Sequence, residues 1–218
     1  MRALRLLAIT PLLAITACQV APPKPPLVET IAILPFDNES NDVNADTIMQ
    51  TYVFLAMKQS AYRTSDIKAV NEKLEKAGVV DGGQLPALDP VKIAKDLNVQ
   101  ALMYGYVESF GYVNIGIYAE RKVRLNLKLV DGQTGQTLWE NTQTAADRKF
   151  ALDKKEAQAN LVQGLTQQFA DKLFNSPLEE EAKLATIKTL SSLPGFQFNG
   201  FPAMDVKKSA VKDFIRKQ

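Results

Sequence analysis

The feature that most constrains the fold is an alternating segment from Ile117 to Leu129. Its odd-numbered positions are apolar with one exception, Arg121, and its even-numbered positions carry polar side chains or tyrosine. Successive side chains of a β-strand point to opposite faces of the sheet, so the pattern predicts a strand buried on one face and wet on the other. Arg121 interrupts the otherwise apolar face.

Two further strands are expected beside this one. Val99 to Val113 is rich in aromatic and β-branched residues, and "VNIG" after it is typical of a turn. On the other side, "DGQTGQ" predicts a turn and "QTLWENTQT" a returning strand. "LVDGQTGQ" is not a phosphate-binding loop, because it lacks Gly-Lys-Ser/Thr and opens a strand instead of a helix.

The part of the chain before these strands reads as alternating strands and helices. The expected elements are a buried strand at Thr30–Phe36, a helix at 45–60 capped by Asn44, a short strand at 61–64, a helix capped by Ser65 that ends at Ala77 before Gly78, a loop at "VVDGGQLPAL", and a helix that starts at Asp89-Pro90.

Two helices are expected after the strands. One runs from about Asp153 to Phe174, where Leu161, Leu165, Phe169 and Leu173 recur at helical spacing. The other follows Ser176-Pro177-Leu178-Glu179, a capping-box pattern, and runs to about Leu190. The whole order predicts an α+β or α/β fold, with a single mixed sheet and helices packed on one or both faces.

The amino terminus predicts an export signal. Met1–Arg5 is basic, and the apolar stretch Leu6–Ile15 has ten residues, which falls short of the roughly 20 that a membrane-spanning helix needs. Ile15, Thr16 and Ala17 precede Cys18, the only cysteine, and together they resemble a bacterial lipobox. The alternative is a plain secretory signal with a cysteine there by chance.

Cys18 is therefore the expected site of lipid attachment, since a thiolate is the good nucleophile that would accept a diacylglyceryl group. Gln19, which is not Asp, favours the outer membrane by resemblance to enterobacterial sorting. Prolines within residues 19–29 favour polyproline II, which would reach about 30 Å. The expected divisions are a signal peptide at 1–17, an acylated tether at 18–29, an α+β domain at 30–175 and a helical extension at 176–218.

Composition removes several function classes. The chain has no histidine, so the usual general base and the commonest zinc ligand are missing. One cysteine allows no internal disulfide and no thiolate cluster. The net charge of +2 comes from Arg2 and Arg5 in the signal segment, which leaves no electrostatic footprint for nucleic acid. We expect no cofactor, no metal and no catalytic residues.

Three stretches, "IAILPFDNESNDVNAD", "DLNVQALMYGYVESFG" and "LVDGQTGQTLWENT", resemble a family of uncharacterised bacterial lipoproteins that includes a meningococcal surface lipoprotein studied as a vaccine antigen. More loosely, Leu34-Pro35-Phe36 and the hairpin around Leu138-Trp139 look like CsgG and the amino-terminal domain of TolB. The resemblance supplies no catalytic residues. It implies a fold like those two proteins and a CsgG-like lipoprotein as a partner.

Three stretches are candidate sites. Tyr104, Tyr106, Phe110 and Tyr112 occupy even positions, so a regular strand would place them on one face as a partner-contact surface; the alternative is core covered by helices. The loop Asp37–Asp42 has oxygen ligands at alternate positions but lacks the glycine and the final glutamate of a calcium loop. "MDVKKSAVKDFIRKQ" at the carboxy terminus is either a basic amphipathic helix or a tail.

The leading hypothesis is a non-enzymatic lipoprotein on the periplasmic face of the outer membrane. It would act through protein–protein contacts in an envelope or secretion complex, with sheet edges and the tyrosine-rich strand as contact surfaces. Formation of homodimers is a further hypothesis. The alternatives are a cell-wall hydrolase that uses Asp or Glu and a solute- or metal-binding lipoprotein, either of which a deep pocket with converging carboxylates would favour.

Overall fold

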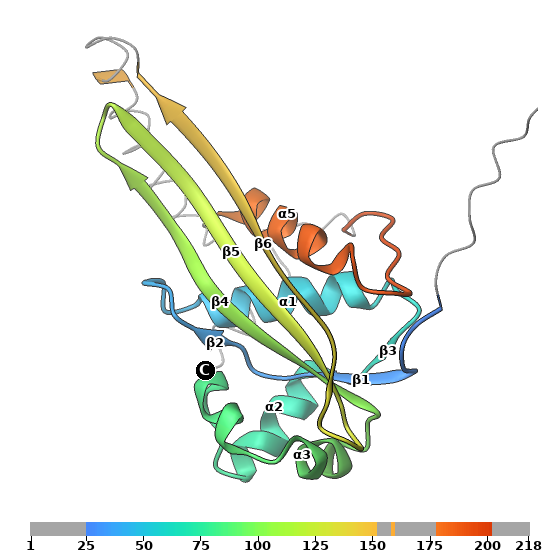
Figure 1. Cartoon of the computed structure of the whole chain (residues 1–218). Coiled ribbons are helices and arrows are strands. Elements are labelled where there is room, and N and C mark those ends of the chain that lie inside the picture. Colours follow the sequence, from blue (N-terminus) through green and yellow to red (C-terminus); the bar gives the residue numbers. More distant parts are fainter. Residues whose placement is uncertain (1–24, 152–157, 160–177, 202–218) are drawn as a thin grey trace, which may run out of the picture.

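The computed structural model describes residues 25–151, 158–159 and 178–201 (Figure 1). Outside these residues lie Cys18, its lipobox, most of the tether, all but residues 158–159 of the helix expected at 153–174, and the basic segment after Phe201. Within the described ranges, no helix combines the length and the apolar character that crossing a membrane would require.

The fold is built on a single mixed sheet, as the sequence predicts. Its strands are β1 (Thr30–Ile33), β2 (Asp37–Asn38), β3 (Arg63–Thr64), β4 (Ala101–Asn114), β5 (Tyr118–Asp131) and β6 (Thr137–Phe150). The order is β3-β1-β4-β5-β6, with β2 also beside β4. β1 pairs in parallel with β3 and β4, whereas β4, β5 and β6 form an antiparallel meander.

Helices cover both faces of this sheet. The described helices are α1 (Ala45–Met57), α2 (Ile67–Lys76), the 3₁₀ helix η1 (Gly82–Ala87), α3 (Pro90–Leu97) and α5 (Glu179–Leu190). α1 and α5 share a core with one face, in which Met49 and Ala185 contribute beside Leu125. α2, η1 and α3 share a second core with the opposite face, around Leu34 and Leu102. The architecture is therefore three layers around one sheet.

The antiparallel strands extend well beyond the helices as a three-stranded ribbon (Figure 1). β4, β5 and β6 have 14 residues each, which corresponds to about 45 Å of strand. β1 pairs with the start of β4, where Ile31 faces Ala101, so the amino-terminal tether enters at the base of the ribbon. The turn between β4 and β5 lies at the far end.

The alternation in β5 predicts its faces correctly. Ala119, Val123, Leu125, Leu127 and Leu129 are all buried. Ile117 does not follow them, because it lies in the turn before β5 and is 64% exposed. The start of α3 is also confirmed: the Asp89 side chain accepts a hydrogen bond from the Val91 N–H at 2.9 Å, and Pro90 occupies the first turn.

Several predicted boundaries are wrong for local reasons. The first strand ends at Ile33, three residues early, although the Leu34 N–H still donates to the Met103 carbonyl at 3.0 Å; Pro35, whose ring fixes φ at about −65°, follows directly. α1 begins after Asn44 as expected, but the Asn44 side chain makes no capping bond and the helix ends at Met57. Asp66, not Ser65, caps α2, since the Ser65 N–H donates to the Ile31 carbonyl and continues the sheet edge.

Two further expectations are corrected. The segment "VVDGGQLPAL", where the sequence predicts a loop, contains η1, for which Asp81 and Gln84 form a reciprocal capping box. α5 ends at Leu190 as expected, but its first residue is Glu179 and its N-cap position is Leu178, in a left-handed conformation, so the helix does not start from Ser176. Three glutamates in its first turn complement the helix dipole.

Candidate functional site

The four aromatic residues of β4 do not share a face. The register passes from Val107 opposite Leu125 to Ser109 opposite Arg124, so Glu108 is an extra residue in a β-bulge. Before the bulge the even positions face the core under α2 and α3, and after it they face the core under α1 and α5. The prediction of one aromatic surface is therefore wrong, because the strand is not regular.

The bulge gives the four side chains different surroundings. Phe110 is 3% exposed and belongs to the core under α1 and α5, against which Tyr112 packs. Tyr104 is buried under α2 and α3, with half-buried Tyr106 beside it. Burial, reinforced by the nearby groups Tyr106 and Asp89, raises the pKa of Tyr104 to about 12. Tyr106 thus remains the tyrosine best placed for contact on that face.

Lys128 contacts both Tyr104 and Tyr106. Its Nζ lies 5.4 Å from the ring centroid of Tyr104 and 5.4 Å from that of Tyr106, which places the ammonium over both aromatic faces. Further along β5, the Asn126 amide donates to Glu140 Oε1 at 3.0 Å and to Thr142 Oγ1 at 2.7 Å. Polar side chains on this face of the ribbon are therefore linked to one another across the strands, although Asn126 Oδ1 is buried without a partner among the described residues.

The oxygen-rich loop before α1 is closed by its own hydrogen bonds. Asn38 Nδ2 donates to the Asp42 carbonyl at 2.7 Å, and the Ser40 N–H donates to Asn38 Oδ1 at 3.0 Å. Asp42 Oδ1 accepts from the Asn44 N–H at 2.9 Å. Across the described residues, no cluster of three or more acidic, histidine or cysteine side chains has a geometry that could hold a metal ion.

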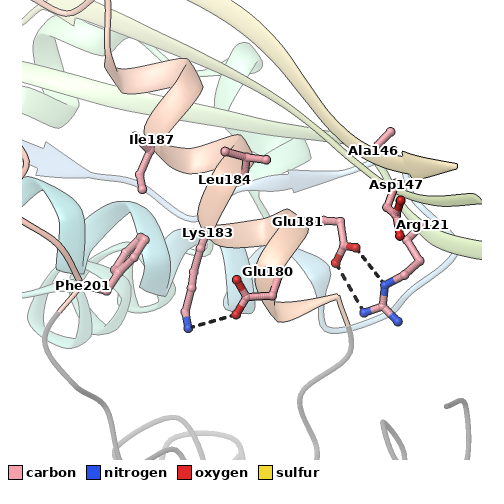
Figure 2. A pocket seen from close by; sticks show the side chains of 9 residues that line it. All are labelled: Arg121, Ala146, Asp147, Glu180, Glu181, Lys183, Leu184, Ile187 and Phe201. Carbon is pink, nitrogen blue, oxygen red and sulfur yellow. Dashed lines mark hydrogen bonds and ion pairs between the residues drawn. The ribbon is translucent and has the colours of Figure 1, made fainter.

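A pocket of 630 Å³ opens between α5 and the ribbon (Figure 2). Charged groups from both elements lie around it, and apolar side chains of α5 and Phe201 complete its wall. The lining residues are Arg121, Ala146, Asp147, Glu180, Glu181, Lys183, Leu184, Ile187 and Phe201.

Arg121 and Glu181 form a buried ion pair at one end of this pocket. Arg121 Nε lies 2.8 Å from Glu181 Oε1, and Nη2 lies 3.4 Å from Oε2. Their side chains are only 15% and 9% exposed. Lys183 in turn contacts Glu180 at 3.8 Å. Two of the three carboxylates in the pocket thus contact cations of the same domain, and of these two only Glu181 is buried, whereas Glu180 is 87% exposed.

The far end of the ribbon exposes apolar side chains. Val113 is 52% exposed, and Ile115 and Ile117 are each 64% exposed. They flank a tight turn in which Asn114 Oδ1 accepts the Gly116 N–H at 2.8 Å and Gly116 has a φ of 82°. We call Val113, Ile115 and Ile117 the distal tip. A group of exposed apolar residues at the end of a projecting element is typical of a contact surface.

Arg121 is visible in the sequence as the exception on an apolar strand face. Its partner Glu181 lies 60 residues further along the chain, and no sequence pattern connects the two. From sequence, "VNIG" is predicted only as a turn. The signal for the distal tip was present, since three aliphatic residues surround a hairpin turn where polar residues are usual.

Comparison with known proteins places the chain among bacterial lipoproteins. Residues 19–199 match the protein family described as "Putative lipoprotein GNA1162-like". A lipoprotein of Neisseria meningitidis serogroup B, NMB1124/NMB1162, is 21% identical over 203 residues, which are 89% of this chain and 92% of that protein.

One solved structure shares the fold. The crystal structure of lipoprotein GNA1162 from Neisseria meningitidis has a TM-score of 0.50 and 23% identity, and the match covers 66% of this chain and 99% of that one. The PelC dodecamer from Paraburkholderia phytofirmans gives a looser match, with a TM-score of 0.46 and 14% identity over 78% of this chain and 94% of PelC.

Proposed function

This chain belongs to the GNA1162-like family of lipoproteins, and on that premise we propose that acyl chains on Cys18 hold it at a bacterial membrane, where its folded domain is a non-catalytic docking module. The lipobox Ile15-Thr16-Ala17 would direct cleavage before Cys18. Each buried methylene stabilises membrane binding by about 0.8 kcal/mol, so two or three acyl chains would make attachment effectively permanent.

The observation that carries the docking role is the distal tip. Its three aliphatic side chains are at least half exposed, whereas Leu125, Leu127 and Leu129 on the same ribbon are fully buried. The exposed part of these side chains does not contribute to this domain's own core, and burying that apolar area against a partner would be favourable by about 25 cal/mol per Å². A partner with an apolar recess would therefore gain the most binding free energy by contacting the distal tip.

The position of the tether supports this role. The chain enters β1 at the base of the ribbon, and about 45 Å of strand separates that point from the tip. The residues from Gln19 to Glu29 would add about 30 Å of reach. Tethering also raises the effective concentration of the tip for anything held at the same membrane.

We place the protein on the periplasmic face of the outer membrane, on the ground of Gln19 after the acylated cysteine. Its first candidate partner is a CsgG-like lipoprotein, which the sequence resemblance implies. Tyr106, half-buried beside Lys128, is a second candidate contact residue on the polar face of the ribbon.

The test places a photo-crosslinking amino acid at Ile115 of the full-length chain in its native envelope. A matched control carries the same amino acid at Val43, which is 86% exposed on the loop before α1. We expect a discrete adduct from Ile115 that is absent from Val43 and is lost in the Cys18→Ser variant, which should also leave the membrane fraction. Equal adducts from both positions, or none from Ile115, would refute the docking role.

A further inference from the structure

We infer that β6 is a self-pairing edge: two copies of this chain join antiparallel through β6, with Thr144 of one copy opposite Thr144 of the other. The inference goes beyond the docking role of the distal tip, because it concerns another surface and another partner. It also does not depend on acylation of Cys18.

β6 is the last strand in the sheet order, and among the described residues no strand pairs with its outer side. It has 14 residues and contains neither proline nor glycine. Edge strands of this length are usually shortened, covered or interrupted by proline, because a regular row of unpaired N–H and C=O groups invites another strand. β6 has one register irregularity, at Leu138 near its start, and from Trp139 to Phe150 its pairing with β5 is regular.

The hydrogen bonds at the ends of the strands show which groups of β6 point outward. The Ala151 N–H donates to the Ile117 carbonyl at 3.0 Å, and the Ile115 N–H donates to the Tyr118 carbonyl at 2.9 Å. Since hydrogen-bonded pairs alternate along an antiparallel ladder, odd-numbered residues beyond the irregularity near Leu129 bond to β5. The even-numbered residues of β6 from Glu140 to Phe150 therefore direct their N–H and C=O groups away from the sheet.

To form hydrogen bonds between two copies, even-numbered residues of one β6 strand must lie opposite even-numbered residues of the other. The register in which the two Thr144 residues face each other meets this condition and also places complementary side chains opposite each other. Residues equally far from Thr144 then face each other across the two strands. Glu140 lies opposite the second copy's Arg148, Leu138 opposite its Phe150, and Thr142 opposite its Ala146. Each of these pairs occurs twice, because a two-fold interface is self-complementary.

The exposure of these side chains agrees with this register. Leu138 is 38% exposed and Phe150 is 64% exposed, and together they would form an apolar contact at each end of the interface. Arg148 contacts Glu120 of its own chain at 2.6 Å but keeps 56% of its side chain exposed. Its guanidinium has further donors for a second carboxylate, so Glu140 of the other copy can share it.

Neighbouring registers are less favourable. Centring the pair on Gln143 or Ala145 keeps the hydrogen bonds but places Glu140 opposite Ala146 or Phe150. Opposite charges directly across two strands contribute about 0.2–1 kcal/mol per pair, and a charge against an apolar side chain forgoes that contribution. The charges along β6 therefore favour Thr144 as the centre and favour a second copy over an unrelated strand.

The first experiment exploits the two-fold symmetry with two charge reversals in the full-length chain, Glu140→Arg and Arg148→Glu. In a dimer of either variant alone, residues 140 and 148 that face each other carry the same charge at both ends of the interface. We therefore expect its dimer dissociation constant, measured by sedimentation, to be at least about tenfold higher than that of wild type. Mixed one to one, the new arginine of one variant faces the new glutamate of the other, and the native Arg148 faces the native Glu140. Both pairs are restored, and we expect heterodimers.

The second experiment fixes the register through disulfide formation in full-length Cys18→Ala chains, where an added cysteine is the only thiol. Thr144→Cys should crosslink under mild oxidation, since facing Cα atoms in a hydrogen-bonded pair lie about 5.5 Å apart. The matched control Thr142→Cys should not, because the two thiols would be offset along the strands by about 13 Å. A monomeric wild-type chain, no recovery on mixing, or equal crosslinking at Thr142 would overturn the inference.

Discussion

Arg121 of β5 and Glu181 of α5, which are 60 residues apart in sequence, form a two-bond ion pair that fastens the helix to the ribbon. Arg121 stands on the apolar face of β5 between Ala119 and Val123. Its guanidinium can occupy that face because a carboxylate compensates it there. The pair therefore explains how one charged residue fits into an otherwise apolar face.

Removing one partner of this ion pair should lower the stability of the fold. Glu181→Ala leaves the Arg121 guanidinium in a site where it is 15% exposed, and we expect a loss of roughly 2–4 kcal/mol in the free energy of unfolding. The double variant Arg121→Leu/Glu181→Leu removes both charges and should lie much closer to wild type. Urea unfolding of the single and double variants measures the difference.

The matched control for this cycle is Glu180→Ala on the same turn of α5. The Glu180 side chain is 87% exposed, so its loss should change stability by less than about 0.5 kcal/mol. If Glu181→Ala were as mild as Glu180→Ala, the ion pair would not hold α5 in place.

Two glycines of β4 offer a second matched comparison. A Cβ at Gly105 would overlap the ring of Phe36, whereas a Cβ at Gly111 would meet no atom within 4 Å. We expect Gly105→Ala to lower stability by roughly 1–3 kcal/mol through overpacking and Gly111→Ala to be neutral or slightly stabilising. Thermal unfolding followed by circular dichroism distinguishes the two, and equal losses would show that Phe36 yields to the added methyl group.

The β-bulge at Glu108 predicts unequal roles for aromatic residues on either side of it. Phe110→Ala empties a site that is 3% exposed and should cost roughly 3–5 kcal/mol. Tyr106→Ala removes a half-buried ring and should cost less than about 2 kcal/mol. Similar losses for both variants in denaturant unfolding would mean that the strand runs regularly and that the two rings are equivalent.

The parts of the fold that depend on local pattern could be predicted from sequence. Alternation in β5, the cap and proline at Asp89-Pro90, and the order of strands and helices led to a single mixed sheet, because these signals act over a few residues. The bulge at Glu108 could not be predicted, since its geometry depends on the register with β5. It reversed the faces of Phe110 and Tyr112.

The candidate site was harder to predict for the same reason. Arg121 was visible as an exception, but Glu181 is joined to it only by the packing of α5. The choice of Asp66 over Ser65 as the cap of α2 likewise depended on a tertiary contact, the hydrogen bond from Ser65 to Ile31 in the sheet. Sequence spacing carries little information about contacts between distant segments.

The last prediction concerns Asp46 in the first turn of α1. Burial raises the pKa of its carboxyl group, and the charge of Asp81 adds to that effect, although the Thr47 N–H opposes it. Among the described residues, its Oδ1 atom is buried with no hydrogen-bond partner. The folded-state pKa therefore lies above the unfolded value, so ionisation of Asp46 lowers stability as the pH rises through that range.

Asp46→Asn keeps the shape of the protonated side chain without its titration. At about pH 3 the variant and wild type should have similar free energies of unfolding, and the variant should become the more stable of the two as the pH rises to about 7. Urea unfolding across this range measures the difference, with Asp96→Asn on the exposed side of α3 as the control. A difference between variant and wild type that stays constant with pH, or that favours wild type at neutral pH, would contradict a raised pKa, because only a carboxyl that binds its proton more tightly in the folded state gives this slope.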